Sequence, residues 1–241
     1  MTGTYLNVAG IVAGGLVGLA WKKPLSAANQ MFCKTALGAL TVFFGLRLTW
    51  LGVNGSIRQI LAQLAVVMLS LTLGKLVGRL LRLQKSSNRL GQFAREKMAG
   101  AKPGDANRFL TGFQVCAALF CAAPIGILGA ISDGLSGDFA PLAVKALMDG
   151  LAAMSFISIF GGGVLLAAVP VLVFQGTISL ACARFLLPLL EAHGLVEPVN
   201  ATAGLLIFCV ALIIFEVRKI EVTDYLPSLV FAPVLTWWWL R

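Results

Sequence analysis

Residues 133–175 read DGLSGDFAPLAVKALMDGLAAMSFISIFGGGVLLAAVPVLVFQ. Most of this stretch is apolar over lengths that suit a membrane-spanning helix, which needs about 20 residues. Two charged residues, Lys145 and Asp149, interrupt it four positions apart. Ionisable side chains are costly inside a bilayer and usually face the protein interior or a water-filled cavity. The stretch therefore predicts a membrane fold and is where we expect a functional site.

The composition of the whole chain agrees with this interpretation. Of its 241 residues, 59% are hydrophobic and 12% are charged, and the mean hydropathy is +0.90. Soluble domains are roughly 45–50% apolar and about 25% charged. The sequence therefore predicts an all-α polytopic membrane protein, with residues 1–241 forming a single transmembrane domain.

The net charge of +9 is concentrated in one segment. Residues 75–108 contain nine basic and two acidic residues, which gives a net charge of +7. A basic segment between apolar spans indicates the cytoplasmic side of a membrane rather than a nucleic-acid-binding surface. We expect residues 80–108 to form a basic cytoplasmic loop, and we expect anionic lipid or a partner protein to bind Arg79, Arg82, Lys85, Arg89 and Arg95.

Eight apolar segments are candidates for spanning helices: 4–21, 32–53, 57–79, 109–132, 140–160, 163–187, 199–217 and 222–240. The first does not have the pattern of a signal peptide, because Lys22 and Lys23 follow its apolar run instead of preceding it. With eight spans, the lysine- and arginine-rich connections all fall on one side of the membrane, which is then cytoplasmic. Both termini are expected outside.

Spans one to three and six to eight share a weak pattern. Residues 7–19 can be aligned with 168–180, and residues 38–46 with 204–212. The two units would cross the bilayer in opposite senses, and such inverted repeats are common in secondary transporters, with the solute site near the midplane. Chance similarity between apolar segments is the alternative explanation.

Four segments of the chain show a family resemblance. They are GTYLNVAGIVAGGLVGL (3–19), ISDGLSGDFAPLAVKALMDG (131–150), GGGVLLAAVPVLVFQGTISL (161–180) and NATAGLLIFCVALIIFEVRKIEVTDYLPSLVFAP (200–233). Together they resemble the bacterial integral-membrane family called domain of unknown function 554 (YdfK/YqgA-like). The chain departs from the family pattern at Ile213 and Ile214, where a polar Asn is expected. The resemblance implies a multi-span inner-membrane protein and implies no particular activity.

Polar residues within or beside the spans are candidates for an ion or solute pathway. Lys145 and Asp149 would share one helix face. Gln175 follows a proline that should bend its span, and Asn7 is a polar residue in the first span. Asp133 is expected near the outer mouth, where acidic groups attract cations.

Each of these residues also has a purely structural interpretation. Lys145 and Asp149 could form an ion pair that neutralises itself between helices, and Gln175 and Asn7 could form polar contacts between helices. Asp133 could belong to an ordinary exterior turn. The sequence leaves both interpretations open for all five residues.

The sequence lacks the patterns of an enzyme or a metal centre. The five cysteines lie in or beside apolar segments without a CxxC pair, and the one histidine is distant from them. No HExxH, GxSxG or phosphate-binding loop occurs. We expect no catalytic residue, no metal and no cofactor.

Glycines recur every four residues in the first span, at Gly10, Gly14 and Gly18. Small residues at this spacing allow two helices to approach closely. The contact could lie within the chain or in a homodimer.

Two functions fit these observations. The first is a secondary transporter or channel-like permeation pathway for a small ion or polar solute, with a pathway through Asp149, Lys145, Gln175, Asn7 and Asp133. The second is a non-transporting membrane scaffold or accessory subunit that binds a partner or anionic lipid through the basic loop.

Overall fold

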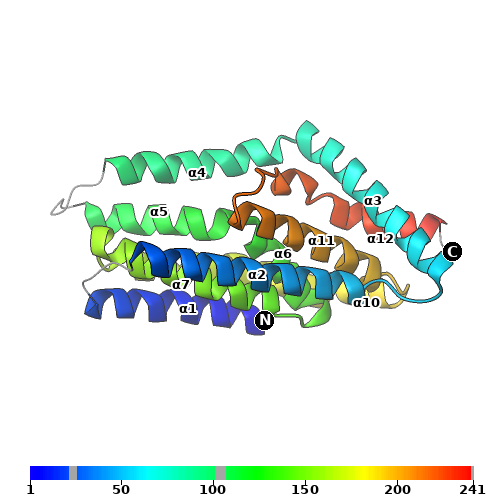
Figure 1. The fold of residues 1–241 in the computed structure, drawn as a ribbon, viewed down its shortest axis with the longest axis horizontal. Coiled ribbons are helices and arrows are strands. Elements are labelled where there is room, and N and C mark those ends of the chain that lie inside the picture. The colour runs from blue at the N-terminus through cyan, green and yellow to red at the C-terminus, as the bar shows by residue number, and fades with distance from the viewer. Residues whose placement is uncertain (22–25, 101–106, 240–241) are drawn as a thin grey trace.

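The computed structural model describes residues 1–21, 26–100 and 107–239. This part of the chain forms helices and contains no β-strand. Most helices run along the long axis of an elongated bundle, as Figure 1 shows. In chain order they are α1 (Thr2–Ala20), α2 (Ala27–Leu51), α3 (Ile57–Leu80), α4 (Leu83–Ala99), α5 (Arg108–Ala122), α6 (Pro124–Ser136), α7 (Ala140–Phe160), α8 (Gly163–Leu166), α9 (Ala168–Ala181), the π-helix η1 (Cys182–Leu186), α10 (Leu187–Glu191), α11 (Val196–Ile214), the 3₁₀ helix η2 (Val222–Tyr225) and α12 (Ser228–Trp239). Lys22, Lys23 and Lys102, which contribute to the expected cytoplasmic charge, lie outside the described residues.

In the part of the chain that the structure describes, six helices or helix series are long and apolar enough to cross a membrane. They are α1, α2, α3, α7, the continuous series Gly163–Glu191, and α11. A seventh is added if α5 and α6 count as one span, although their axes are bent by 59°. The eighth expected segment, 222–240, does not form a full-length spanning helix. Its helix α12 has 12 residues and is about 18 Å long, whereas a hydrocarbon core is roughly 30 Å thick. The described helices therefore do not reach the expected number of eight full-length spans.

The glycine face of α1 packs against α7. A Cβ atom on Gly14 would lie 2.0 Å from the carbonyl oxygen of Gly150, so this close approach requires glycine. Gly3 contacts Leu142 and Gly18 contacts Met154, and the two helices therefore run parallel. The glycine repeat of the first span thus packs within the chain.

Two other pairs of helices pack antiparallel. In the α2–α11 pair, Gly45 contacts Phe208 while Gly52 contacts Ala201, nearer the start of α11. In the α3–α12 pair, Gly74 contacts Ser228, which begins α12. The α2–α11 pair contacts α6 and α7, which carry the buried charged residues Asp133, Lys145 and Asp149.

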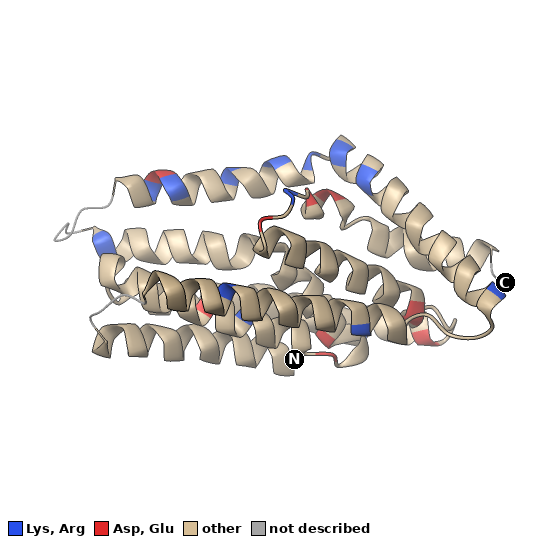
Figure 2. Cartoon of the chain, in the orientation of Figure 1, with Lys and Arg blue, Asp and Glu red and all other residues tan. Residues whose placement is uncertain are grey.

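The segment predicted as a basic loop is largely helical. Helix α4 follows α3 after a left-handed turn at Arg82, where φ is 55°. The backbone N–H of Gln84 in its first turn donates to Asp224 Oδ1 at 2.7 Å, which fixes the start of the helix against η2. Farther along, Ala94 is fully buried in the core cluster that includes Val115 of α5. Lys and Arg residues are distributed along α4 and the adjoining end of α3, as Figure 2 shows.

Candidate functional site

A buried ion pair lies on α7 inside the bundle. Lys145 Nζ donates a hydrogen bond to Asp149 Oδ2 one helical turn away. Lys145 is only 1% exposed. Its ammonium also lies 5.9 Å from the centre of the Phe120 ring. Because an unpaired charge at this depth would be strongly destabilising, each charge depends on the other.

An amide pair lies beside the ion pair. Asn7 Nδ2 of α1 donates to Gln175 Oε1 of α9 at 3.1 Å, and both residues are fully buried. The Asn7 side chain also interacts with the Asp149 carboxylate. Two atoms of this pair, Asn7 Oδ1 and Gln175 Nε2, have no hydrogen-bond partner. Buried polar atoms are nearly always bonded, so two unpartnered ones are unusual.

We call Asn7, Lys145, Asp149 and Gln175 the polar cluster. Helices α1, α7 and α9 bring these four residues together from three distant parts of the sequence. The cluster has one cation, one anion and two neutral amides. It is electrically neutral as a whole and can exchange hydrogen-bond partners without exposing a net charge.

The break between α5 and α6 was not predicted. Pro124 lacks a backbone N–H and disfavours helical geometry at the residue before it. Ala123 accordingly adopts an extended conformation, with φ −66° and ψ 121°. The expected continuous span over residues 109–132 is therefore wrong at its middle, where Pro124 was the available signal.

The break lies against the polar cluster. A Cβ atom on Gly126, in the first turn of α6, would lie 2.8 Å from Lys145 Cε and 3.1 Å from Gln175 Nε2. Interrupted helices at membrane depth occur where their backbone is buried in protein or lines a cavity. Such interruptions also present free backbone groups to a solute. The cluster and the break together form the candidate site.

Asp133 is placed differently from the sequence-based expectation. It lies within α6, is 5% exposed and is not part of an exterior turn. Its Oδ2 accepts the backbone N–H of Gly3 at 3.2 Å and lies 3.1 Å from the ammonium of Met1. The carboxylate thus stabilises the N-terminal end of α1, where a negative charge is favourable. The structure does not bring Asp133 into direct contact with the cluster.

Thr4 is a buried polar residue that the sequence analysis missed. It is fully buried on the same face of α1 as Asn7, one turn away, and its Oγ1 has no hydrogen-bond partner. The spacing of three residues between Thr4 and Asn7 was the available signal. Thr4 lies between the Asp133 contact at the start of α1 and the polar cluster.

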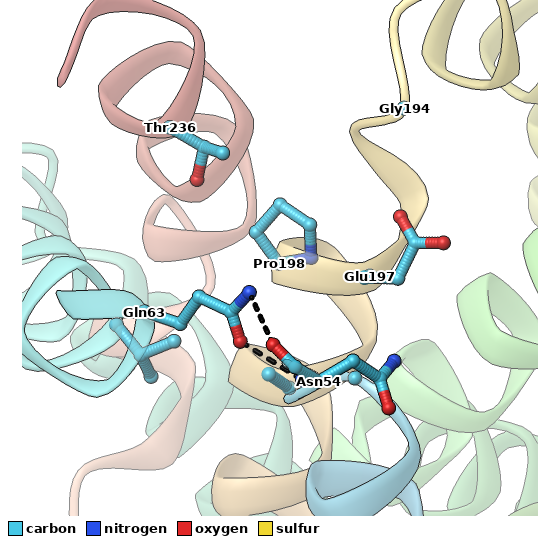
Figure 3. A pocket seen from close by; sticks show the side chains of 9 residues that line it. Asn54, Gln63, Gly194, Glu197, Pro198 and Thr236 are labelled. Atoms are coloured by element: carbon cyan, nitrogen blue, oxygen red, sulfur yellow. Dashed lines mark hydrogen bonds between the residues drawn. The ribbon is translucent and has the colours of Figure 1, made fainter. Parts of the chain in front are cut away.

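Two cavities lie where α10 and α11 meet, the end of the bundle expected to face outside. The larger, about 580 Å³, includes three carboxylate residues and no Lys or Arg in its lining, namely Asp133, Glu191 and Glu197. The smaller, about 280 Å³, lies between the α2–α3 turn, α11 and α12 (Figure 3). In its wall the backbone N–H of Asn54 donates to Gln63 Oε1 at 3.0 Å, and Gln63 Nε2 donates to the carbonyl oxygen of Asn54 at 3.1 Å. These bonds hold the α2–α3 turn together, so we assign the smaller cavity a structural role.

A groove of about 450 Å³ lies between α4 and α5 near the α5–α6 break. Its α4 side is polar and includes Arg95, whereas its α5 side consists of Leu119, Ala122 and Ala123. Phe120, between these α5 residues, is buried with its ring beside Lys145. The last turn of α5 therefore separates the groove from the polar cluster.

The basic residues predicted to bind lipid or a partner are spread along one edge of the bundle. Arg79 ends α3 and lies 3.5 Å from Glu221 Oε2, with both side chains exposed. Arg82 occupies the turn between α3 and α4. The remaining three, Lys85, Arg89 and Arg95, are exposed on α4. None of the five contributes to the polar cluster.

A second lysine–carboxylate pair offers a comparison. Lys34 of α2 donates to Glu216 Oε1 beyond the end of α11, where the Glu216 side chain is 78% exposed. This hydrogen bond lowers the pKa of the Glu216 carboxyl from its ordinary value. The two pairs have the same chemistry and differ in burial, so Glu216 is a suitable control for Asp149.

Comparisons with known proteins extend over nearly the whole chain. The family described as "Protein of unknown function (DUF554)" matches residues 2–237. The uncharacterized protein YqgA of Escherichia coli (strain K12) is 27% identical over 238 residues, which cover 98% of this chain and 97% of the relative. The uncharacterized membrane protein YdfK of Bacillus subtilis (strain 168) is 28% identical over 236 residues, which cover 98% and 95%. No solved structure matches the chain.

Proposed function

This chain belongs to the membrane-protein family of unknown function DUF554, and we propose that it is a secondary transporter or channel-like pathway for a small ion or polar solute. The observation that supports this most strongly is the polar cluster beside the α5–α6 break. A protein that only needs to pack its helices gains little from a buried ion pair, because apolar residues of similar volume are often at least as stabilising. A solute site near the middle of a bundle requires polar groups there.

The unpartnered atoms favour a binding role over a purely structural one. A structural network would be expected to bond its members fully, because unpartnered buried polar atoms are costly. Asn7 Oδ1 and Gln175 Nε2 instead remain available to a ligand. Gly126 lets Lys145 and Gln175 pack directly against the backbone at the break, because a Cβ atom there would lie 2.8 Å from Lys145 Cε and 3.1 Å from Gln175 Nε2.

The arrangement of the helices is compatible with the proposed inverted repeat. Its three pairs of equivalent segments, α1 with α9, α2 with α11 and α3 with α12, are all in contact. Gly176 of α9 contacts Thr4, while Gly15 contacts Leu165 of α8, which precedes α9 in the same continuous helix series, so α1 and this series run antiparallel like the other two pairs. Opposite directions are what a two-fold axis in the membrane plane requires. We therefore propose two inverted units, with α12 as a shortened eighth segment.

We also propose an orientation in the bacterial inner membrane. The basic α3–α4 edge would face the cytoplasm and the cavities near α10 and α11 would face outside, following the positive-inside rule. Both termini then belong to the outer side. The groove between α4 and α5 becomes the cytoplasmic approach to the cluster, and the acidic cavity lined by Asp133 becomes the outer approach.

A flux screen with purified protein in proteoliposomes tests the transport proposal. Wild-type protein should move at least one solute from a panel of alkali cations, small inorganic anions and carboxylates. Asp149→Asn should reduce that flux to the level of empty liposomes, because Lys145 would lose its partner and the site its only carboxylate. Glu216→Gln, at the exposed pair, should leave the flux unchanged. Absence of any flux above empty liposomes across the whole panel would refute the transport proposal.

A second function is favoured by one observation on α4. Leu90 and Phe93 are exposed apolar residues beside the exposed basic residues Lys85 and Arg89. A helix with apolar and basic flanks suits the surface of an anionic membrane. If the chain is a scaffold held there, charge-neutralising changes of Lys85 and Arg89 should abolish recovery of its partner or lipid, while Asp149→Asn should have no effect on that recovery.

A further inference from the structure

We propose that the solute is a small monovalent cation that exchanges with a proton, and that Asp149 alternately binds this cation and the Lys145 ammonium. This inference rests on the transport function proposed above and adds the class of solute and the coupling. Three features carry it: oxygen atoms aligned along α1, the charge of the outer cavity, and the chemistry of the ion pair.

Polar oxygen atoms on and beside α1 follow one another toward Asp149, and two of them are unpartnered. Asp133 accepts a hydrogen bond from Gly3 at the start of the helix and also lines the outer cavity. Thr4 follows with an unpartnered Oγ1, and Asn7 follows one turn later with an unpartnered Oδ1 on a side chain that also interacts with Asp149. Carboxylate, hydroxyl and amide oxygens are ligands of hard cations. This series, which we call the α1 oxygen line, begins at a residue that lines the acidic cavity and ends beside a buried carboxylate.

The outer cavity selects for the same charge. Among the described residues its lining includes Asp133, Glu191 and Glu197 and no lysine or arginine, and because Asp133 is paired with the Met1 ammonium, Glu191 and Glu197 carry its negative charge. Acidic groups at a narrow opening raise the local concentration of cations and repel anions. A cation would therefore meet favourable groups both at the cavity and along the α1 oxygen line.

Several groups near the polar cluster would favour an anion instead. Together they favour an anion less strongly than the carboxylates and oxygen atoms favour a cation. The N-terminus of α6 and the Gln175 amide can donate to an anion, and Arg95 lines the inner groove. An anion in the cluster would, however, lie near Asp149, and the one buried ammonium is already paired with that carboxylate. The C-terminal carbonyl groups of α5 and the face of the Phe120 ring meet at the same break, and both attract cations.

The exchange conserves charge and atoms. A cation M⁺ enters the α1 oxygen line and binds the Asp149 carboxylate. The Lys145 ammonium is displaced from that carboxylate and releases one proton to water, leaving a neutral amine. Release of M⁺ on the other side lets Lys145 take up a proton again and re-form the pair. Each cycle moves one M⁺ against one H⁺, and the buried site never carries a net charge.

Few other titratable groups face this pair. On α7 they are Lys145 and Asp149 themselves, and α5 contributes the thiols of Cys116 and Cys121, whose surroundings include the pair. From α1 and α9 the facing residues are Asn7, Thr4 and Gln175, which do not titrate. Asp133 of α6 and the Met1 ammonium form a separate pair at the end of α1. The proton that the proposed cycle exchanges is therefore the one on the Lys145 ammonium, which pairs with Asp149.

The test uses full-length protein in proteoliposomes containing a pH-sensitive dye. Adding NaCl, KCl or LiCl to one side of a pH gradient should move protons through wild-type protein, and potassium gluconate should act as KCl does. Asp149→Asn should abolish the response. Lys145→Gln should still bind or pass the cation, measured with ²²Na⁺ or ⁸⁶Rb⁺, but without proton movement.

A second variant keeps the test informative if the charge variants fail to fold. Thr4→Val removes a hydroxyl that has no hydrogen-bond partner, so a structural role predicts no loss. We expect the cation-driven proton flux to fall about tenfold, as for loss of one coordinating oxygen, with the melting temperature unchanged. Thr41→Val is the matched control, because Thr41 is buried on α2 away from the line.

The outcomes separate this inference from the transport proposal. If a solute other than an alkali cation moves and its flux depends on Asp149, transport stands and the cation assignment is overturned. Cation flux without proton movement in wild-type protein overturns the exchange. If Thr4→Val and Thr41→Val have equal effects, the α1 oxygen line is overturned.

Discussion

At the scale of single residues, the main question is why a lysine is fully buried in an apolar helix. Lys145 is 1% exposed, and its position on α7 leaves it no route to solvent in this conformation. Asp149 compensates the charge from the adjacent turn. The pair is thus self-contained within one helix, and its neighbours on α1 and α9 supply neutral polar contacts instead of further charge.

A double-mutant cycle measures this dependence. Lys145→Met alone should destabilise the protein by about 3–5 kcal/mol, because it leaves Asp149 buried without a counter-charge. Asp149→Leu alone should cost a similar amount, about 3–5 kcal/mol, for the converse reason. Thermal unfolding in detergent measures the stability of these two single variants and of the double variant that completes the cycle.

The double variant Lys145→Met/Asp149→Leu should recover most of the lost stability, since two apolar side chains then replace both charges. The stability lost in the double variant should be much smaller than the sum of the losses in the two single variants, as expected for residues in contact. Additive losses would show that the two charges do not depend on each other.

The sequence predicted four of the five site residues to lie at membrane depth, and the structure brings those four together. Lys145 and Asp149 were predictable because charges in an apolar run are rare. Their contact with Asn7 and Gln175 could not be deduced, because it depends on how α1 and α9 pack. Asp133 was assigned to an outer turn because glycines flank it, yet α6 continues through Gly134 and buries it. Whether these residues act on a solute remains a prediction.

At the scale of helices, close packing by glycine determines which elements touch. The α1–α7 contact is the clearest case, because Gly14 and Gly150 bring the two backbones together beside the ion pair. This packing is also what carries Asn7 to Asp149. A side chain at position 14 would push α1 away from α7 and would therefore disrupt both the backbone contact with Gly150 and the placement of Asn7 beside Asp149.

Gly14→Leu should therefore destabilise the protein by at least about 1–3 kcal/mol, the usual cost of overpacking, because it must push α1 away from α7. Detergent melting temperatures measure this effect. Gly91→Ala is the matched control, because a Cβ atom there meets nothing within 4 Å, and alanine is the better helix former. A melting temperature for Gly14→Leu equal to that of the Gly91→Ala variant would contradict the assigned packing.

Helix α4 shows where prediction from sequence was limited. Its charges suggested a loop, although Ser87, Gly91, Ala94 and Met98 recur at helical spacing and are at least partly buried. The deciding contact is distant in sequence: Asp224 accepts the N–H of Gln84, and Gln84 Oε1 accepts the N–H of Thr223 at 3.2 Å. No local pattern reveals a cap supplied from 140 residues away.

Asp224→Ala should loosen the start of α4. Loss of a helix-capping carboxylate typically costs about 0.5–2 kcal/mol, and the nearby Lys85 and Arg89 should then be cleaved faster by trypsin in detergent. Glu221→Ala serves as the control, since Glu221 is exposed and pairs only with exposed Arg79. Equal cleavage rates in the two variants would argue against the capping role.

At the scale of the whole molecule, the apolar segments could be predicted and the shape of two of them could not. The spans at α1, α2, α3, α7 and α11 follow from runs of apolar residues of sufficient length. The fourth segment is bent because Pro124 interrupts it, and the last is short because η2 and Pro227 occupy its beginning. Length and hydropathy alone do not distinguish a straight helix from a broken one.

The packed helices also leave the polar cluster closed in this conformation. Asn7 and Gln175 are fully buried, while an acidic cavity lies where α10 and α11 meet and a separate groove lies between α4 and α5. A transporter must open such a site to each side in turn, and movement at the α5–α6 break would be the simplest way to do so. The proposed function therefore requires the cluster to be reachable from both sides over time.

The most direct test is the reactivity of a single cysteine at position 7 toward a membrane-impermeant thiol reagent, added from either side of inside-out and right-side-out vesicles. The native cysteines would first be replaced, and Thr41→Cys, equally buried on α2, would serve as the control. Our account predicts that Asn7→Cys is modified from both sides while Thr41→Cys is not. If Asn7→Cys is no more reactive than Thr41→Cys from either side, the polar cluster is a static structural element, and the proposed pathway is wrong.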